Sequence, residues 1–160
     1  MTREATIVPR AATTAQRSPL LAVDGVVLCR HAADHGRSHW HVLLIRRGRE
    51  PYQGMWAFPG GFVELGEDLG AAVHREVAEE TGLEGLPFDQ FRAFGDPKRD
   101  PRSHTVSIVY VAEIAGERPA VCGGSDAAEA AWHALDALPE LAFDHREILD
   151  EIMVTRHTTL

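Results

Sequence analysis

Three glutamates share one side of a predicted helix with part of its apolar stripe. Within "VHREVAEETGL" (residues 73–83), Glu76, Glu79 and Glu80 span less than a third of the helix circumference at about 100° per residue. Leu69 and Val73 lie beside or within that arc, so a solvated glutamate-rich surface helix fits poorly. Bound Mg²⁺ or Mn²⁺ would offset the repulsion, because hard cations bind carboxylate oxygens and bridge to substrate phosphates.

Neighbouring residues could support such a metal site. Arg75 stands four residues before Glu79, close enough on a helix to pair with its carboxylate. Glu67 comes just before the helix, where its negative charge suits the helix N-terminus. Gly60 and Gly61 have no side chain, so they let the backbone approach a cation or substrate and leave carbonyl oxygens available as ligands.

The surrounding sequence predicts a layered domain of mixed strands with two substantial helices, an α/β or α+β fold. Asp68 is the expected N-cap of the glutamate-bearing helix, and Thr81-Gly82 is its expected C-terminal stop. A closing amphipathic helix is expected over Phe143–His157. Strands are expected over Leu21–Arg30, His41–Gly48, Met55–Val63 (breaking at Pro59), Gln90–Asp96, His104–Ile114 and Ala131–Leu135, with loops over His31–Trp40, Pro97–Ser103 and most of Glu117–Ala130.

Length and composition narrow the protein class. The 160 residues predict one domain, over 18–160, after a disordered polar extension over 1–17, for which a transit peptide is the weaker alternative. The formal net charge of -8 argues against a nucleic-acid surface, which needs clustered Lys and Arg, but allows a nucleotide that binds through a cation. Two cysteines in no close pair predict a cytoplasmic protein, and no apolar run approaches the ~20 residues of a membrane span.

The glutamate-bearing segment resembles a complete Nudix box. The matching residues are Gly61, then Glu67 after five residues, then "REVAEETGL" (residues 75–83) after seven more. No defining position departs from the pattern, and about eight restricted positions at fixed spacing make a chance match remote. The resemblance extends from about Ser18 into the closing helix.

This resemblance implies a Nudix-type α/β/α sandwich, in which a mixed sheet lies between helices and the box helix carries the metal carboxylates. It also implies hydrolysis of a nucleoside diphosphate linked to another group, dependent on Mg²⁺ or Mn²⁺. By position in the box, Arg75 would orient the carboxylates and act with Glu76, Glu79 and Glu80 in catalysis. The implied metal ligands are Glu76, Glu79, Glu80 and the carbonyl of Gly60. Glu67 would either bind the metal as well or support one of its ligands.

The segments "WAFPGGFVELGE", "FGDPKRDPRSHTVSIVYVAEI" and "LAFDHREIL" are similar to the ADP-ribose pyrophosphatase branch, and related Nudix regulators share much of this pattern. The "DPKRDPR" loop presents Arg99 and Arg102, whose guanidinium groups suit phosphate or a terminal ribose phosphate. The alternative is a proline-stiffened loop with solvated charges. Arg46 or Arg47, at the end of the second strand, is expected either to reach phosphate or to be solvated.

The resemblance leaves the catalytic base open. It could be a box glutamate, Glu113 at the end of a strand, or an acid of the following segment, Asp126 or Glu129. Three aromatic residues could stack on a nucleobase, although core packing is favoured for each: Trp56, Phe62 and Tyr110.

Three functions remain in competition. The preferred one is an ADP-ribose pyrophosphatase that releases AMP and ribose 5-phosphate. The second is a pyrophosphohydrolase of nucleoside triphosphates, oxidised ones included. The third is a sensor of an ADP-ribose-type ligand, which has no need of the full set of catalytic carboxylates. The resemblance also implies a homodimer, and neither nucleic-acid nor membrane partners are expected.

Overall fold

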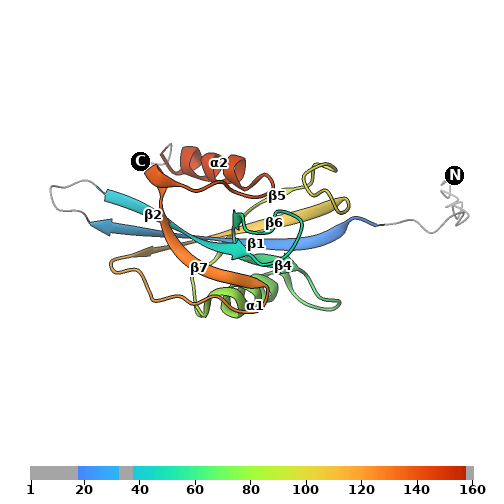
Figure 1. Ribbon diagram of the computed structural model, residues 1–160, viewed down its shortest axis with the longest axis horizontal. Coiled ribbons are helices and arrows are strands. Elements are labelled where there is room, and N and C mark those ends of the chain that lie inside the picture. Colours follow the sequence, from blue (N-terminus) through green and yellow to red (C-terminus); the bar gives the residue numbers. More distant parts are fainter. Residues whose placement is uncertain (1–17, 33–37, 158–160) are drawn as a thin grey trace, which may run out of the picture.

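The computed structural model describes residues 18–32 and 38–157. The predicted extension over 1–17 and the centre of the predicted loop over His31–Trp40 lie outside the described residues. Within them, seven strands form one sheet, and two helices, α1 (Leu69–Thr81) and α2 (His145–His157), cover its opposite faces (Figure 1). The predicted sandwich of two helices around a mixed sheet is confirmed.

The sheet has the strand order β3-β2-β1-β6-β5, with β4 paired to β1 and β7 paired to β2. Strand β1 runs parallel to β6 and antiparallel to β2 and β4, which makes the sheet mixed. A short 3-10 turn, η1 (Leu135–Ala137), follows the last strand. The strands are β1 (Leu20–Ala32), β2 (Ser38–Arg47), β3 (Trp56–Ala57), β4 (Gly60–Phe62), β5 (Asp89–Phe94), β6 (Thr105–Ala115) and β7 (Ala127–Ala134).

Strand β1 lies at the centre because its apolar run can be buried on both faces. Val27 packs with the residues under α1, whereas Val26 and Leu28 pack with those under α2. Gly25 brings α1 close to the sheet, since a Cβ at this position would lie 2.7 Å from Cγ2 of Val77.

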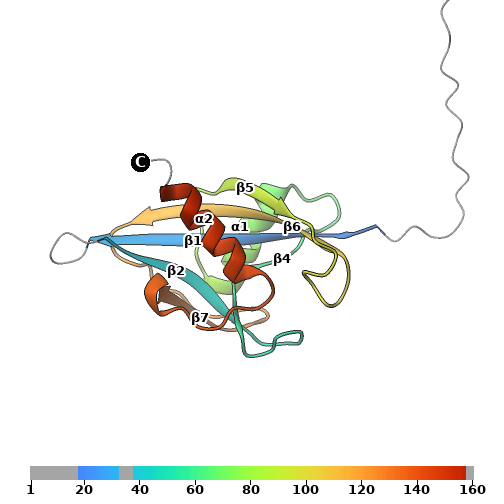
Figure 2. The same ribbon diagram turned by 90° about the horizontal axis from the view of Figure 1, so that it is seen from above.

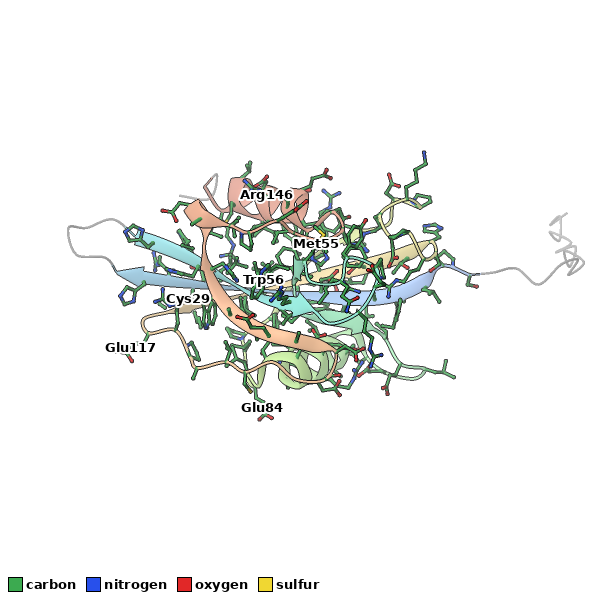
Figure 3. The ribbon with its side chains drawn as sticks, in the orientation of Figure 1. Cys29, Met55, Trp56, Glu84, Glu117 and Arg146 are labelled. Carbon is green, nitrogen blue, oxygen red and sulfur yellow. The ribbon has the colours of Figure 1, made fainter. Side chains whose placement is uncertain are left out.

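Each helix buries one apolar stripe against the sheet and leaves its polar side outward. Figure 2, seen from the α2 side, shows this helix lying over β1. Figure 3 shows Arg146 on α2 and Glu84, just beyond α1, pointing away from the sheet on opposite sides of the molecule. No helix among the described residues is long and apolar enough to cross a membrane. The buried stripes are Ala72, Val73 and Val77 of α1 and Ile148, Leu149 and Ile152 of α2.

Four predicted elements differ from the structure. The expected loop over His31–Trp40 is shorter at both ends, because β1 continues to Ala32 and β2 begins at Ser38. The expected strand over Met55–Val63 is two short strands with different partners, β3 on β2 and β4 on β1. Strand β7 begins four residues before the predicted Ala131, because pairing along β2 overrides the weak strand propensity of an alanine-rich segment. Helix α2 begins at His145, since Phe143 has a positive φ of 54° and cannot be the first helical residue.

Candidate active site

A cavity of about 620 Å³ lies between α1, β4, the end of β2, the loop that precedes β6 and the residues at the start of α2. Its lining combines carboxylates, guanidinium groups and three phenylalanines, Phe58, Phe62 and Phe143. The lining residues used below are Asp24, Arg47, Phe62, Arg75, Glu76, Glu79, Glu80, Arg99, Asp100, Arg102, Asp126, Phe143 and His145.

Local sequence fixes the ends of the helix that carries the glutamates. Asp68 has an extended backbone and accepts the N–H of Gly70 at 2.9 Å, as an N-cap does. Gly82 takes the left-handed conformation at φ 76° and donates its N–H to the carbonyl of Ala78. Both predicted ends of α1 are confirmed, and Glu76, Glu79 and Glu80 face the cavity from this helix.

Arg75 holds the carboxylates around it in fixed positions. Its Nε and Nη2 donate to the two oxygens of Glu67 at 2.7 and 2.9 Å, and its Nη1 donates to Glu76 at 2.8 Å. The pair with Glu79, expected from the sequence, is the longest of these contacts at 3.6 Å. The hydrogen bonds from Arg75, joined by one from the backbone of Glu64, lower the pKa of Glu67 to about 2.

Glu80 is a buried carboxylate with one backbone partner. Its side chain is almost enclosed, at 6% exposure for the residue, and its Oε2 accepts the N–H of Gly60 at 2.9 Å. Its pKa is raised to about 8, chiefly by burial; the Gly60 hydrogen bond opposes the shift, and the charges of Glu76 and Asp24 add to it. Burial likewise raises the pKa of Glu76, although Arg75 pulls it down.

A glycine in the backbone beside these carboxylates leaves room for the Glu76 carboxylate. A Cβ at Gly61 would lie 2.5 Å from Oε1 of Glu76, so any side chain would push that carboxylate out of place. A set of hard oxygen donors, two of them with raised pKa values, fits Mg²⁺ or Mn²⁺. In this conformation, no three His, Cys, Asp or Glu side chains among the described residues gather closely enough to hold a metal ion. A cation must therefore compete with Arg75 for Glu76 and with Gly60 for Glu80.

The two arginines predicted to bind substrate differ in their surroundings. Arg99 is only 5% exposed at its side chain, and it makes a bidentate pair with Asp144 at 2.6 and 2.9 Å. Arg102 is 43% exposed and makes a bidentate pair with Asp100, a buried carboxylate. Arg102 is therefore open to a ligand in the cavity, whereas Arg99 is committed to structural partners.

Phenyl rings hold the guanidinium of Arg102 in the cavity lining. It lies 5.2 Å from the ring centre of Phe62 and 5.8 Å from that of Phe143. Of the three aromatic residues considered for base stacking, Phe62 alone lines the cavity, whereas Tyr110 is buried and Trp56 packs against the core (Figure 3).

Three of the predicted site residues do not line the cavity: Glu67, Arg46 and Glu113. Glu67 instead accepts hydrogen bonds from Arg75, which does line it. Arg46 donates to the carbonyl of Gly54, and it is the neighbouring Arg47 that lines the cavity, because successive strand residues point to opposite faces. Glu113 pairs with Arg156 of α2 and lies four residues along β6 from the level of Asp24, roughly 13 Å away at ~3.3 Å per residue. Glu113 is thus remote from the box glutamates.

The other two acids considered as catalytic base lie near the end of β2. Asp126 lines the cavity and pairs with exposed Arg49 at 2.8 Å. Glu129 is opposite Arg46 in the β2–β7 pairing and does not line the cavity. Of Glu113, Asp126 and Glu129, Asp126 alone lines the cavity with the box carboxylates.

Among the residues that line or support the cavity, sequence reasoning missed Asp24, Asp100, Asp144 and His145. One signal for Asp24 was available, because a carboxylate inside an otherwise apolar strand is costly without partners. Asp144 and His145 stood in "LAFDHREIL", where nothing local shows that they meet Arg99 and β1.

Carboxylates and guanidinium groups in one cavity suit a polyanionic ligand that binds together with a divalent cation. The chain belongs to the Nudix family, since it matches the NUDIX domain over residues 20–152. It is 40% identical over 135 residues to an ADP-ribose pyrophosphatase of Methanocaldococcus jannaschii, which covers 84% of this chain and 73% of that protein.

One further relative is a transcriptional repressor, and a similar solved structure is a Nudix domain bound to ADP ribose. The ADPR responsive transcriptional repressor NtrR of Acinetobacter baylyi is 36% identical over 153 residues, covering 89% of this chain. The chain spans only 58% of that repressor's length. The NUDIX domain of Shewanella oneidensis NrtR, solved with ADP ribose, superposes with a TM-score of 0.74 at 27% identity, covering 87% of this chain and 89% of the other.

Proposed function

We propose that this protein hydrolyses ADP-ribose to AMP and ribose 5-phosphate with Mg²⁺ or Mn²⁺. The observation that carries the proposal is a single cavity lined by the three box glutamates and by Arg102 and Arg47. ADP-ribose as substrate is supported by the pyrophosphatase relative, at 40% identity, and by the related Nudix domain solved with that ligand.

The chain's own residues supply the cation site. Glu76, Glu79 and Glu80 would hold Mg²⁺ or Mn²⁺ together with the carbonyl of Gly60, while Glu67 keeps Arg75 in position behind them. When bound, the cation neutralises the charge of the diphosphate and lowers the pKa of the attacking water.

Glu79 is the cavity carboxylate best suited to accept a proton from that water. Its side chain is 48% exposed, and its contact with Arg75 is a loose 3.6 Å. Glu76 is held at 2.8 Å by the same arginine, and Glu80 is bound to the backbone. Water then attacks one phosphorus, the bridging P–O bond breaks, and the other phosphate leaves with its sugar.

Arg102 would bind phosphate at the far end of the substrate. Because Asp100 and two phenyl rings already fix its guanidinium, little conformational entropy is lost when a phosphate binds the remaining N–H groups. Arg47, half-buried in the same lining, adds positive charge.

A product assay with Mg²⁺ or Mn²⁺ tests the proposal. The substrate panel is ADP-ribose, NADH, diadenosine polyphosphates, dGTP and 8-oxo-dGTP. AMP and ribose 5-phosphate from ADP-ribose are expected, with slower turnover of the others. Pyrophosphate released from the triphosphates in preference would instead favour the second candidate, a nucleotide-pool pyrophosphohydrolase.

A ligand sensor is the alternative from another class, and similarity to the NtrR repressor favours it. Tight ADP-ribose binding without turnover, measured by calorimetry with Mg²⁺ present, would establish the sensor in place of the enzyme. The homodimer and the cytoplasmic location stay predictions, and sedimentation at low micromolar concentration tests the first.

A further inference from the structure

A buried polar network lies against the strand that carries Gly60. Asp24 of β1 accepts a short hydrogen bond from Ser107 of β6, and it lies 3.9 Å from Arg99 and 3.6 Å from His145. Arg99 in turn pairs with Asp144. The network joins β1, β6, the loop before β6 and the start of α2, and the proposed chemistry uses none of its members directly.

His145 is the member that contacts the backbone of the site. Its ring is buried, and its Nδ1 accepts the N–H of Phe58 at 3.0 Å. Since Nδ1 acts as the acceptor, the proton of the neutral ring resides on Nε2, which faces Oδ1 of Asp24 at 3.6 Å. The ring also stacks on that of Phe58, with centres 4.5 Å apart.

The segment Phe58–Gly60 has a particular need for such support. Its two N–H groups both donate to side chains, that of Phe58 to His145 and that of Gly60 to Glu80 at 2.9 Å. Pro59 has no N–H, and its carbonyl accepts from Gly25 at 2.8 Å. The Gly60 bond competes with any cation for Glu80, whereas the Phe58 bond uses no proposed ligand.

We propose that His145 is a positioning residue for the cation site. It holds Phe58–Gly60 in register while Glu80 binds the cation, and Asp24 orients the ring through Nε2. This inference rests on the proposed function, in which the carbonyl of Gly60 and the carboxylate of Glu80 are ligands. His145, in the "LAFDHREIL" segment, would then support the cation ligands without contacting substrate.

Mn²⁺ affinity of two matched variants tests it. His145→Asn places an amide oxygen near the position of Nδ1 and keeps an acceptor for Phe58, whereas His145→Gln places its amide near Nε2 and loses that acceptor. Titration of Mn²⁺ followed by electron paramagnetic resonance should show the dissociation constant raised ~10–100-fold in His145→Gln and by less than about 3-fold in His145→Asn. Equal constants in the wild type and both folded variants would overturn the proposal.

If a variant does not fold, hydrogen exchange and ¹⁵N shifts of the wild-type protein still test the bond between His145 and Phe58. The amide of Phe58 should stay protected from hydrogen exchange with and without Mg²⁺, while that of Gly60 changes on addition of Mg²⁺. The ring ¹⁵N shifts of His145 should report the Nε2–H form. A freely exchanging Phe58 amide, or an Nδ1–H ring, overturns the role of His145. Failure of the wild type to bind Mn²⁺ overturns the proposed metal site instead. Hydrogen exchange at Phe58 still reports on its bond to His145 in that case.

Discussion

Replacing Glu80 by glutamine should stabilise the metal-free protein at alkaline pH. The pKa of this buried carboxylate is about 8, against an ordinary value of 4.5. Between these values the native state binds more protons than the unfolded state, so the free energy of unfolding falls as pH rises. The stability penalty is absent below about pH 4.5, grows by about 1.4 kcal/mol per pH unit and is complete above about pH 8.

The full penalty is about 4–5 kcal/mol, from a difference of roughly 3.5 pKa units, and it is an upper figure because the site can relax or admit water. Glutamine keeps the shape and an acceptor for Gly60 but carries no charge, so Glu80→Gln escapes this loss. The variant and the wild type should therefore be about equally stable at pH 5, and at pH 9 the variant should be more stable by several kcal/mol.

Urea unfolding in EDTA at pH 5, 7 and 9 measures the difference. Glu79→Gln is the matched control, because Glu79 stands on the same helix with an exposed side chain. Adding Mg²⁺ at about 100 times its dissociation constant should stabilise the wild type by about 2.7 kcal/mol and the Glu80→Gln variant far less. Parallel pH profiles for the wild type and Glu80→Gln would refute the idea that Glu80 is an ionisable group forced into the interior.

The other predictions concern turnover, binding and stability. Glu79→Gln should lower kcat for ADP-ribose by ~10²–10⁴-fold with an unchanged circular dichroism spectrum, and near wild-type kcat would remove Glu79 as the base. Arg102→Ala should raise KM for ADP-ribose, whereas Arg46→Ala, outside the cavity, should not; equal KM values in both variants would detach Arg102 from the substrate. Arg99→Ala should cost about 3 kcal/mol in urea unfolding, because Asp144 and its neighbours lose a buried partner, and an unchanged midpoint would show that the pair is dispensable.

Helix α1 was predictable because its signals are local. An N-cap at Asp68, a left-handed glycine at position 82 and a 3.6-residue apolar period all act within a few residues of chain. The placement of Glu76 and Glu80 beside the buried face follows from the same period. Local signals therefore located the carboxylates of the candidate site as well as the helix.

The partners of Arg99 could not be predicted in the same way. Asp144 is 45 residues away in the chain, and Asp24 is 75 residues away, so only the tertiary fold brings them together. The sequence therefore favoured a substrate phosphate, and not a buried carboxylate, as the partner of Arg99. Strand β7 was underestimated for a related reason, since its alanines carry little strand propensity and pairing with β2 determines its length.

The close packing at Gly25 has a consequence for how the site keeps its dimensions. The proposed cation ligands belong to two separate bodies, α1 and the sheet, and the gap between these bodies is set where Val77 rests on a residue without a side chain. Contact between hydrocarbon and backbone does not titrate and is not screened by salt. The distance between the ligand oxygens of α1 and those of the sheet thus depends on the apolar contact of Val77 with Gly25. This contact does not change when the carboxylates nearby gain or lose protons and cations.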